Sequence, residues 1–321
     1  MLIILPPLFC LNALGSLGSE RVEKHLKIDL HSHSTCSDGK ESVAEVFHQA
    51  KLSGVDILAL TDHDTTHGWA EAASAAAHEG IGFVPGIEVT TRAHVFSPAG
   101  ELHKFGVHML AYLPDPNHVE LAEVLAESVT SRETRLRAIV DKIGADYDLD
   151  WSDVEMFIAD GATFGRPAVA DAMVHRGHFD SRDSVFAQIW PNGSDRYYVP
   201  NRGVPDTVEA IRLIRRAGGV PIIAHPMSRG KGPAEGQPMP RAHFEEMIEA
   251  GLAGFEVDHR DVPEHAKKWL REMAAEFDLV ITGSSDYHGV DGKKNRLGEN
   301  TTNPEMLERI LAQATGTIAQ L

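Results

Sequence analysis

The segment Ile28-Asp29-Leu30-His31-Ser32-His33-Ser34-Thr35-Cys36-Ser37-Asp38-Gly39 decides the fold, because an apolar run gives way there to a turn with two histidines and a carboxylate. His31 and His33 are two positions apart, so on an extended backbone both side chains point to the same face. With Asp38 they form half of a site for a borderline cation such as zinc or manganese. An HxH pair alone also fits two polar residues at the end of a strand, so the interpretation depends on repetition along the chain.

The same layout recurs in short apolar runs that end in His, Asp or Glu. The runs and the residues that follow them are 55–60 with Thr61-Asp62-His63-Asp64, 82–87 with Glu88, 105–107 with His108, 220–224 with His225, 254–257 with Asp258-His259, and 279–283 with Ser284-Ser285-Asp286-Tyr287-His288. Helical patterns lie between such runs at residues 42–53, 69–78, 205–217 and 263–277. This alternation predicts an α/β fold with parallel strands in βα units. In a barrel of such units, the loops after the strands converge on one mouth, where chemistry is placed.

Five motifs, HxHxxxSDG, TDHD, GIE, AHP and SDYH, follow one another in this order. Together they resemble the polymerase-and-histidinol-phosphatase (PHP) family of metal-dependent phosphoesterases, and the resemblance covers residues 27–298. The chain is most similar to the branch that contains 3',5'-nucleoside bisphosphate phosphatases and 5'-3' exoribonucleases, which Gly165-Arg166-Pro167 and Tyr198-Val199-Pro200 also resemble. The resemblance implies a distorted seven-stranded (β/α) barrel similar to a TIM barrel.

The motifs divide the chain into segments. Residues 25–112 and 206–321 carry the motifs and are expected to form the barrel. Residues 113–205 carry none of the ligand motifs but show helical patterns at 119–142 and 151–160, so we predict an inserted helical subdomain that covers the active site. Residues 1–24 begin with an apolar run that has no Lys or Arg before Arg21, which favours a disordered extension or a misassigned start over a signal peptide. We expect a cytoplasmic protein that does not bind membranes.

The resemblance also implies three divalent metal ions in one cleft. It places His31, His33, Glu88 and Asp286 around the first ion, Asp38, His63 and the bridging Glu88 around the second, and His108, His225 and His288 around the third. A bridging carboxylate independently suits a pair of ions about 3.5–4 Å apart. Some family members have histidine at the position of Asp38, so an oxygen ligand here favours manganese, with zinc or iron(II) as alternatives.

Two of these ligands have rival interpretations. His63 lies between Asp62 and Asp64, so it could also be a surface histidine that forms an ion pair. The two aspartates themselves are expected to accept the second imidazole proton of a metal ligand and not to bind metal. His103 competes with His108, and the position after an apolar run favours His108.

Substrate contacts are less strongly indicated than metal ligands. A dianionic ester needs cationic donors, preferably arginine. Arg166 is the first candidate, because the related branch has an arginine there facing the cleft, and a surface arginine is the alternative. Arg229, which follows the His225 strand end, and His259 are further candidates, although plain loop positions explain both as well. Lys293, Lys294 and Arg296 are similar candidates after His288.

The charge balance limits the class of partner. The net charge is −17, from 47 acidic and 30 basic side chains, which disfavours binding of duplex nucleic acid and favours a small phosphorylated substrate. The two cysteines argue against a disulfide scaffold. The sequence does not determine the oligomeric state.

Clustered dications suit hydrolysis of a phosphate ester by a hydroxide that bridges two metals. We therefore expect Asp38, His63, Glu88 and Asp286 to be the catalytic residues of a phosphoesterase, acting on the 3'-phosphate of a 3',5'-nucleoside bisphosphate. The alternatives are a 5'-3' exoribonuclease, a cyclic phosphodiesterase or a histidinol phosphatase on the same site, and a catalytically silent module that holds metals and assists a polymerase.

Overall fold

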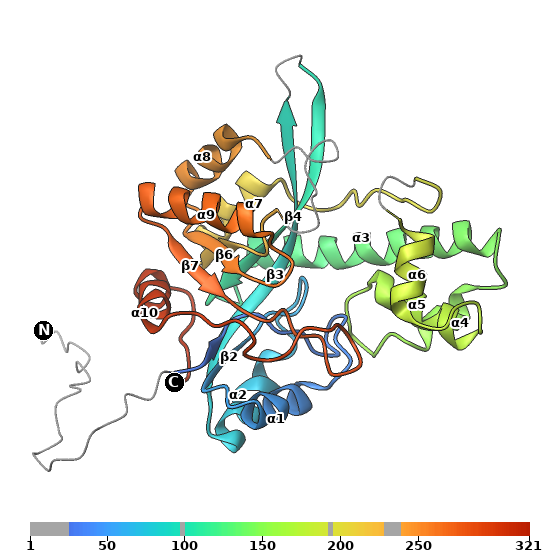
Figure 1. Ribbon diagram of the computed structural model, residues 1–321, viewed down its shortest axis with the longest axis horizontal. Coiled ribbons are helices and arrows are strands. Elements are labelled where there is room, and N and C mark those ends of the chain that lie inside the picture. Colours follow the sequence, from blue (N-terminus) through green and yellow to red (C-terminus); the bar gives the residue numbers. More distant parts are fainter. Residues whose placement is uncertain (1–25, 97–99, 192–194, 228–238) are drawn as a thin grey trace, which may run out of the picture.

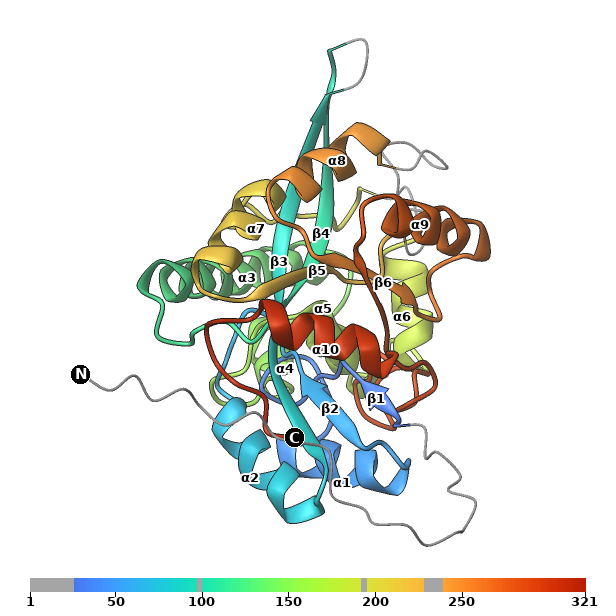
Figure 2. The same cartoon turned by 90° about the vertical axis from the view of Figure 1, so that its left-hand side faces the viewer.

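A seven-stranded sheet forms the centre of the molecule, and helices surround it (Figures 1 and 2). The computed structural model describes residues 26–96, 100–191, 195–227 and 239–321. The predicted N-terminal extension and Arg229 lie outside the described residues. The strands follow the chain order in the sheet, and they are β1 (Ile28–Asp29), β2 (Ile57–Leu60), β3 (Gly82–Phe96), β4 (Leu102–Tyr112), β5 (Val220–Ile223), β6 (Gly254–Asp258) and β7 (Val280–Gly283).

The direction of β4 differs from the prediction of parallel strands throughout. This strand is antiparallel to both β3 and β5, whereas the other neighbouring strands pair in parallel. Residues 97–101 alone connect β3 to β4, and a parallel crossover needs about a dozen residues or more. The two strands pair over their whole common length and project as a ribbon beyond the sheet (Figures 1 and 2). Glu88 and His108 consequently lie within strands and not at strand ends.

The first and last strands of the sheet are joined through the segments that follow them. In the described part of the chain, β1 and β7 share no ladder, but Ser32 and Tyr287, in the segments that follow these strands, form an isolated parallel bridge. The amide of His33 donates a hydrogen bond of 2.8 Å to the carbonyl of Tyr287. The predicted α/β class is therefore confirmed as a seven-stranded sheet, and this bridge brings the HxH and SDYH motifs together.

Amphipathic helices cover the sheet. In α1, Ser42 and Glu45 form a reciprocal capping box, and the buried residues Val43, Val46, Phe47 and Ala50 have the predicted helical spacing. The predicted helices at 42–53, 69–78, 205–217 and 263–277 are confirmed as α1 (Val43–Leu52), α2 (Trp69–Glu79), α7 (Thr207–Arg216) and α9 (Glu264–Glu276), and α8 (Arg241–Glu249) and α10 (Pro304–Gln313) complete this set.

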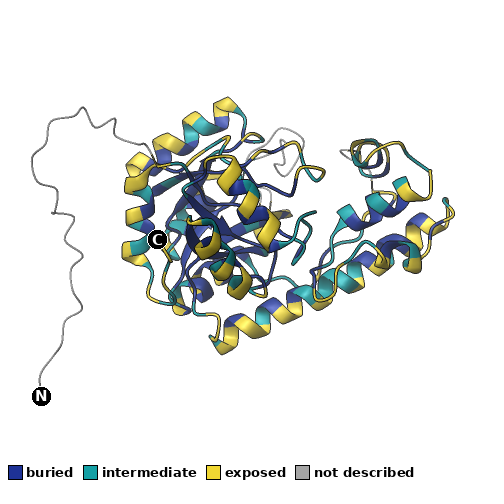
Figure 3. Ribbon diagram, turned by 90° about the horizontal axis from the view of Figure 1, so that it is seen from below, coloured by how far each residue is buried: buried dark blue, intermediate teal, exposed yellow. Residues whose placement is uncertain are grey.

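A second group of helices lies to one side of the sheet (Figure 1). It consists of α3 (Val119–Gly144), α4 (Trp151–Glu155), α5 (Arg166–His175) and α6 (Arg182–Ile189), so the helix expected at 151–160 ends earlier than predicted. Leu121 and Leu125 of α3 pack in a core beside the sheet, whereas the later part of α3 packs with α4–α6 in a separate core. Figure 3 shows these helices with buried inner faces of their own. One helix thus belongs to two cores.

Helices long and apolar enough to cross a membrane do not occur in the described ranges.

Candidate metal centre

The two histidines of the HxH motif lie directly after β1 and are fully buried. Their Nε2 atoms are 3.0 Å apart, so both rings point to one place. The Nε2 of His31 lies 3.3 Å from Glu88 Oε2 and 3.5 Å from Asp286 Oδ1, and the corresponding distances for His33 are 3.1 and 3.3 Å. The four residues predicted around the first ion therefore form one group of converging nitrogen and oxygen donors.

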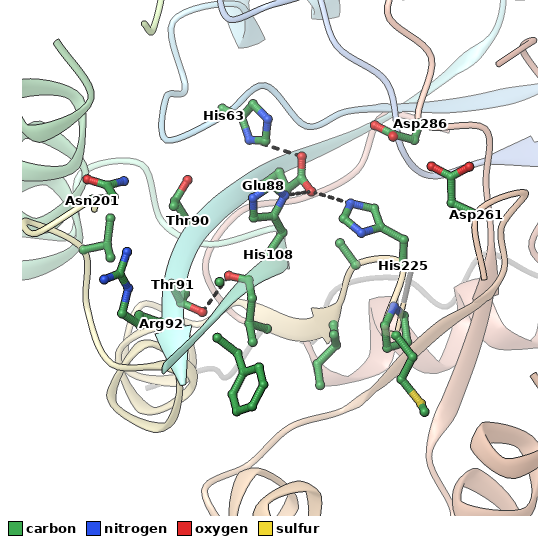
Figure 4. Close-up of a pocket in the computed structure, with 18 of the residues that line it drawn as sticks. His63, Glu88, Thr90, Thr91, Arg92, His108, Asn201, His225, Asp261 and Asp286 are labelled. Carbon is green, nitrogen blue, oxygen red and sulfur yellow. Dashed lines mark hydrogen bonds and ion pairs between the residues drawn. The ribbon is translucent and has the colours of Figure 1, made fainter. Parts of the chain in front are cut away.

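Glu88 lies in the middle of β3, and its carboxylate is the centre of the cluster (Figure 4). Its Oε1 lies 2.8 Å from His108 Nδ1 and 3.0 Å from His225 Nε2, and its Oε2 lies 3.2 Å from His63 Nδ1. Burial alone would raise the pKa of the Glu88 carboxyl, but the surrounding histidines hold it well below its usual range. Glu88 therefore remains a carboxylate that touches several donor groups at once.

Asp38, His63 and His288 form a further group together with His33. The Oδ1 of Asp38 lies 3.1 Å from His288 Nε2 and 3.9 Å from His63 Nε2. This differs from the expected arrangement, in which His288 accompanies His108 and His225. The reason is a backbone hydrogen bond of 2.9 Å from the Lys40 amide to the His288 carbonyl, which holds His288 beside the loop of Asp38.

The donor set fits a group of cations. Buried polar atoms normally have a hydrogen-bond partner. In the described structure, however, four atoms of the cluster that could bind a metal are buried without such a partner. These atoms are Asp38 Oδ1, His63 Nδ1, Asp286 Oδ1 and His288 Nε2. Imidazole nitrogens and carboxylate oxygens suit manganese, iron and zinc. Because His63 is only 7% exposed, the alternative of a surface ion pair at this residue is wrong.

Strained backbone accompanies the cluster. Asp64, His225 and Asp286 have positive φ angles of 54°, 30° and 54°, in a region that costs a residue other than glycine about 1–3 kcal/mol. In His225 this conformation directs the backbone amide to Glu256 Oε2 at 2.7 Å. The surrounding structure therefore fixes the direction of these side chains.

We predicted that the two aspartates of the TDHD motif accept a proton from a ligand imidazole, but within the described ranges they have other partners. Asp62 accepts hydrogen bonds from the backbone amide and hydroxyl of Ser34 and from the hydroxyl of Ser37. Asp64 accepts from the amide and hydroxyl of Thr90 and pairs with Arg132 of α3 at 2.6 Å. Both aspartates therefore anchor loops and strands around the cluster, and Asp64 joins it to helix α3.

Glu256 is a supporting residue that sequence reasoning missed. Its carboxylate in β6 is fully buried, lies 2.9 Å from His31 Nδ1 and accepts from the hydroxyl of Ser284. Burial raises the pKa of Glu256, but its interactions with His31 outweigh this and lower the pKa to about 2. The available signal was a lone acidic residue inside the apolar run at 254–257, because an unpaired charge there would be costly.

We expect the Glu256→Gln variant to bind divalent metal about 10- to 100-fold more weakly, because the amide cannot hold both His31 and the His225 backbone in place. Competition with a fluorescent chelator measures this affinity. The exposed Glu249→Gln variant is the control. Equal affinity in Glu256→Gln and the wild type would show that Glu256 does not orient the ligands.

The predicted substrate contacts occupy different places. Arg166 lines a cavity of about 370 Å³ that also contains His63, Glu88, His108, His225 and Asp286. Lys293 lines the same cavity, and its Nζ lies 2.7 Å from Asp286 Oδ2. His259 is buried and is not among the residues that line the cavity. Its Nε2 lies 3.6 Å from Asp286 Oδ2, which places it behind a predicted ligand.

Comparison with known proteins identifies the family. The PHP domain matches residues 29–142. A 3',5'-nucleoside bisphosphate phosphatase from Chromobacterium violaceum is 32% identical over 81% of this chain and 87% of its own length. A 5'-3' exoribonuclease from Haemophilus influenzae is 31% identical over 82% of this chain and 90% of its own length. The chain belongs to the PHP family.

One more relative and one solved structure are also similar to this PHP protein over most of its length. A phosphoribosyl 1,2-cyclic phosphate 1,2-diphosphodiesterase from Eggerthella lenta is 29% identical over 84% of this chain and 97% of its own length. A solved structure from Bifidobacterium adolescentis, classed as a metal-dependent phosphoesterase, has a TM-score of 0.81 and 34% identity over 89% of this chain and 96% of that one. The protein is a PHP-family phosphoesterase with a His/Asp/Glu cluster fit for metal binding.

Proposed function

We propose that this phosphoesterase releases the 3'-phosphate of a nucleoside 3',5'-bisphosphate. The observation that carries the proposal is the lining of the cavity of about 370 Å³, which includes residues of the His/Asp/Glu cluster and also arginines, among them Arg166. This volume is in the usual range for a small-molecule site. Such a cavity suits a ligand with two separated anionic groups and a nucleoside between them.

Three divalent ions, with manganese favoured, would be held by the donor groups of the cluster. The geometry favours His31, His33, Glu88 and Asp286 for one ion, Glu88, His108 and His225 for another, and Asp38, His63 and His288 for the third. When bound, such ions polarise phosphoryl oxygens and lower the pKa of water toward neutrality.

The protein's own groups prepare the site for this chemistry. Glu88 is 1% exposed, so little water reaches it and its charge interactions with the surrounding imidazoles are strong. The Lys293 ammonium neutralises one oxygen of Asp286 and also lines the cavity, where it can contact a phosphoryl oxygen. Charge that develops on the phosphoryl group and the leaving oxygen is stabilised by groups that are already in place.

Arg166 is proposed to bind substrate without affecting the metals. Its guanidinium lies 5.8 Å from the Phe186 ring and 5.6 Å from the Trp190 ring, which keeps it at the cavity wall. We expect Arg166→Ala to raise KM about tenfold or more, because a charge-assisted hydrogen bond is lost, and to leave the metal content unchanged. Steady-state phosphate release and elemental analysis measure the two quantities. An unaltered KM would remove Arg166 from the substrate site.

The main alternative is a 5'-3' exoribonuclease, which the activity of the Haemophilus influenzae relative favours. The net charge of −17 speaks against a long polyanion, but a short RNA could enter the same cavity. A cyclic phosphodiesterase on the same donors is the other alternative, in line with the Eggerthella lenta relative.

Phosphate release from a substrate panel tests the proposal. The panel contains adenosine 3',5'-bisphosphate, AMP, histidinol phosphate, a cyclic ribose phosphate and a short 5'-phosphorylated RNA, each with manganese. Preferred turnover of the bisphosphate is the expected result. Preference for RNA or the cyclic ester would replace the proposed substrate and keep the site. Inactivity on every substrate with metals bound would point to a metal-holding module.

A further inference from the structure

A second, smaller cavity lies beside the His/Asp/Glu cluster. Arg166 lines the cavity of about 370 Å³ (the substrate cavity), whereas its neighbours Gly165 and Pro167 line the second cavity together with Asp38 of the cluster. The volume of the second cavity is about 110 Å³. Pockets for drug-sized molecules begin at about 300 Å³, so this cavity suits a small ion and not a nucleoside.

Two cationic side chains in the lining of this second cavity share one carboxylate. Asp171 of α5 forms an ion pair with the Lys40 ammonium, and its two oxygens accept hydrogen bonds of 2.5 Å each from the Arg182 guanidinium. All three residues line the cavity, so two positive charges there face one negative charge. An ammonium has three N–H donors and a guanidinium has five. Both cations therefore keep donors for a further anion.

Asp38 is the other anionic residue in the lining, and its charge is balanced within the cluster. Its Oδ1 lies 3.1 Å from His288 Nε2 and 3.8 Å from His33 Nδ1. A bound cation at this predicted ligand would offset the charge further. Asp38 therefore does not take the place of a counterion for Lys40 and Arg182.

The first turn of α5 and a buried hydroxyl add to the same wall. Gly165 precedes α5 without a side-chain cap, and the first turn of this helix contains no acidic residue. Gly165, Pro167 and Ala168 line the cavity, and the N-terminus of a helix favours an anion. Thr163 also lines the cavity, and its hydroxyl is buried without a hydrogen-bond partner in the described structure. Buried hydroxyls normally have such a partner, which a ligand in this cavity would supply.

We propose that this second cavity binds inorganic phosphate, the product that leaves the cluster after ester hydrolysis. The inference rests on the proposed function in one respect, because free phosphate is a product of monoester hydrolysis and not of phosphodiester cleavage. An ammonium, a guanidinium and the N-terminus of a helix are all groups that bind phosphate oxygens. Asp38 borders both the cluster and the cavity, so phosphate can enter this cavity while the nucleoside still fills the substrate cavity.

Calorimetric titration of the metal-free protein with inorganic phosphate tests the site apart from catalysis. We expect Lys40→Gln and Arg182→Gln each to weaken phosphate binding about tenfold or more, because a charge-assisted hydrogen bond is lost. Asp171→Asn removes the carboxylate that competes with phosphate for the two cations, and we expect it to bind phosphate about threefold or more tightly. Phosphate held in the substrate cavity would respond to Arg166→Ala instead.

The control is Arg212→Gln, which changes an exposed arginine of α7 that pairs with Glu209 and should keep the wild-type affinity for phosphate. Thermal unfolding without phosphate checks that each variant is folded. If Lys40, Asp171 and Arg182 only held α5 against the loop of Asp38, Asp171→Asn would lose phosphate affinity as the two cation variants do, and the proposal would be overturned. Unchanged affinity in both cation variants, or a loss confined to Arg166→Ala, would also overturn it.

Product inhibition separates this inference from the proposed reaction. With AMP formation from adenosine 3',5'-bisphosphate as the readout, added phosphate is expected to show a noncompetitive component, because the two cavities can be filled together. Arg182→Gln is expected to weaken this component about tenfold. If the bisphosphate is hydrolysed but phosphate inhibits only competitively and equally in both proteins, the reaction stands and the phosphate site fails. If no ester releases phosphate while the binding that depends on Lys40 and Arg182 remains, the phosphate site stands and the proposed function fails.

Discussion

The Glu88→Gln variant is expected to lose phosphate ester hydrolysis by about a thousandfold or more in kcat/KM, together with part of its bound metal. An amide carries no charge to offset neighbouring cations and cannot accept contacts on both of its terminal atoms, and each metal contact is worth several kcal/mol of transition-state stabilisation. The wild-type carboxylate lies within 3.3 Å of nitrogen atoms of His31, His33, His63, His108 and His225. Few single changes would disturb as many predicted ligands.

Phosphate release with manganese and elemental analysis of the dialysed protein measure the two effects. The exposed Glu249→Gln variant makes the same chemical change away from the cluster and is expected to behave as the wild type. If Glu88→Gln kept its metal and stayed within tenfold of wild-type activity, the proposed shared role of Glu88 would be wrong.

The Asp64→Asn variant is expected to lose about 3–5 kcal/mol of unfolding free energy, because it leaves Arg132 with an uncompensated buried charge. The side chain of Asp64 is completely buried and that of Arg132 is 11% exposed. The substitution keeps the shape of the side chain, and asparagine tolerates the positive φ of 54° at this position. The expected loss therefore comes from the charge and not from the backbone.

Urea unfolding monitored by circular dichroism measures this loss. Glu209→Gln breaks the exposed pair with Arg212 and should change the unfolding free energy by about 1 kcal/mol or less. The double variant Asp64→Asn/Arg132→Met removes both charges and should recover part of the loss. A change below about 1 kcal/mol in Asp64→Asn alone would contradict the interpretation of a buried, coupled pair.

The residues of the His/Asp/Glu cluster could be predicted because local sequence patterns reveal them. Spacing of two residues puts His31 and His33 on one face, and the same spacing applies to Asp286 and His288. The structure brings all the predicted donors into one cluster, including His108 in preference to His103, which pairs with Val95 along the ribbon. Their grouping depends on contacts between segments distant in sequence, and for that reason the sequence did not indicate that His288 lies beside Asp38.

Strand direction and supporting residues were harder to predict. An apolar run such as 105–107 does not indicate whether the strand is parallel or antiparallel to its neighbours. Only the short connection between β3 and β4 shows that β4 must be antiparallel to β3. Glu256 was hidden within an apolar run, and Arg132 and Arg135 lay among many charged residues of a polar helix. Each role depends on the tertiary structure. Glu256 contacts His31, Arg132 pairs with Asp64, and Arg135 lines the cavity.

The separate core of α3–α6 has a consequence for how such enzymes diversify. The residues of the His/Asp/Glu cluster lie in and after the strands of the sheet, whereas Arg135 and Arg166 lie on helices with a hydrophobic core of their own. On the proposed role of Arg166, mutations in that interior would change which molecules are accepted while the cluster at the sheet stays in place. Selection can therefore act on substrate range and on reaction type almost as independent traits. Relatives about 30% identical to this chain carry the names of a phosphatase and an exoribonuclease, the pattern that such modular evolution produces.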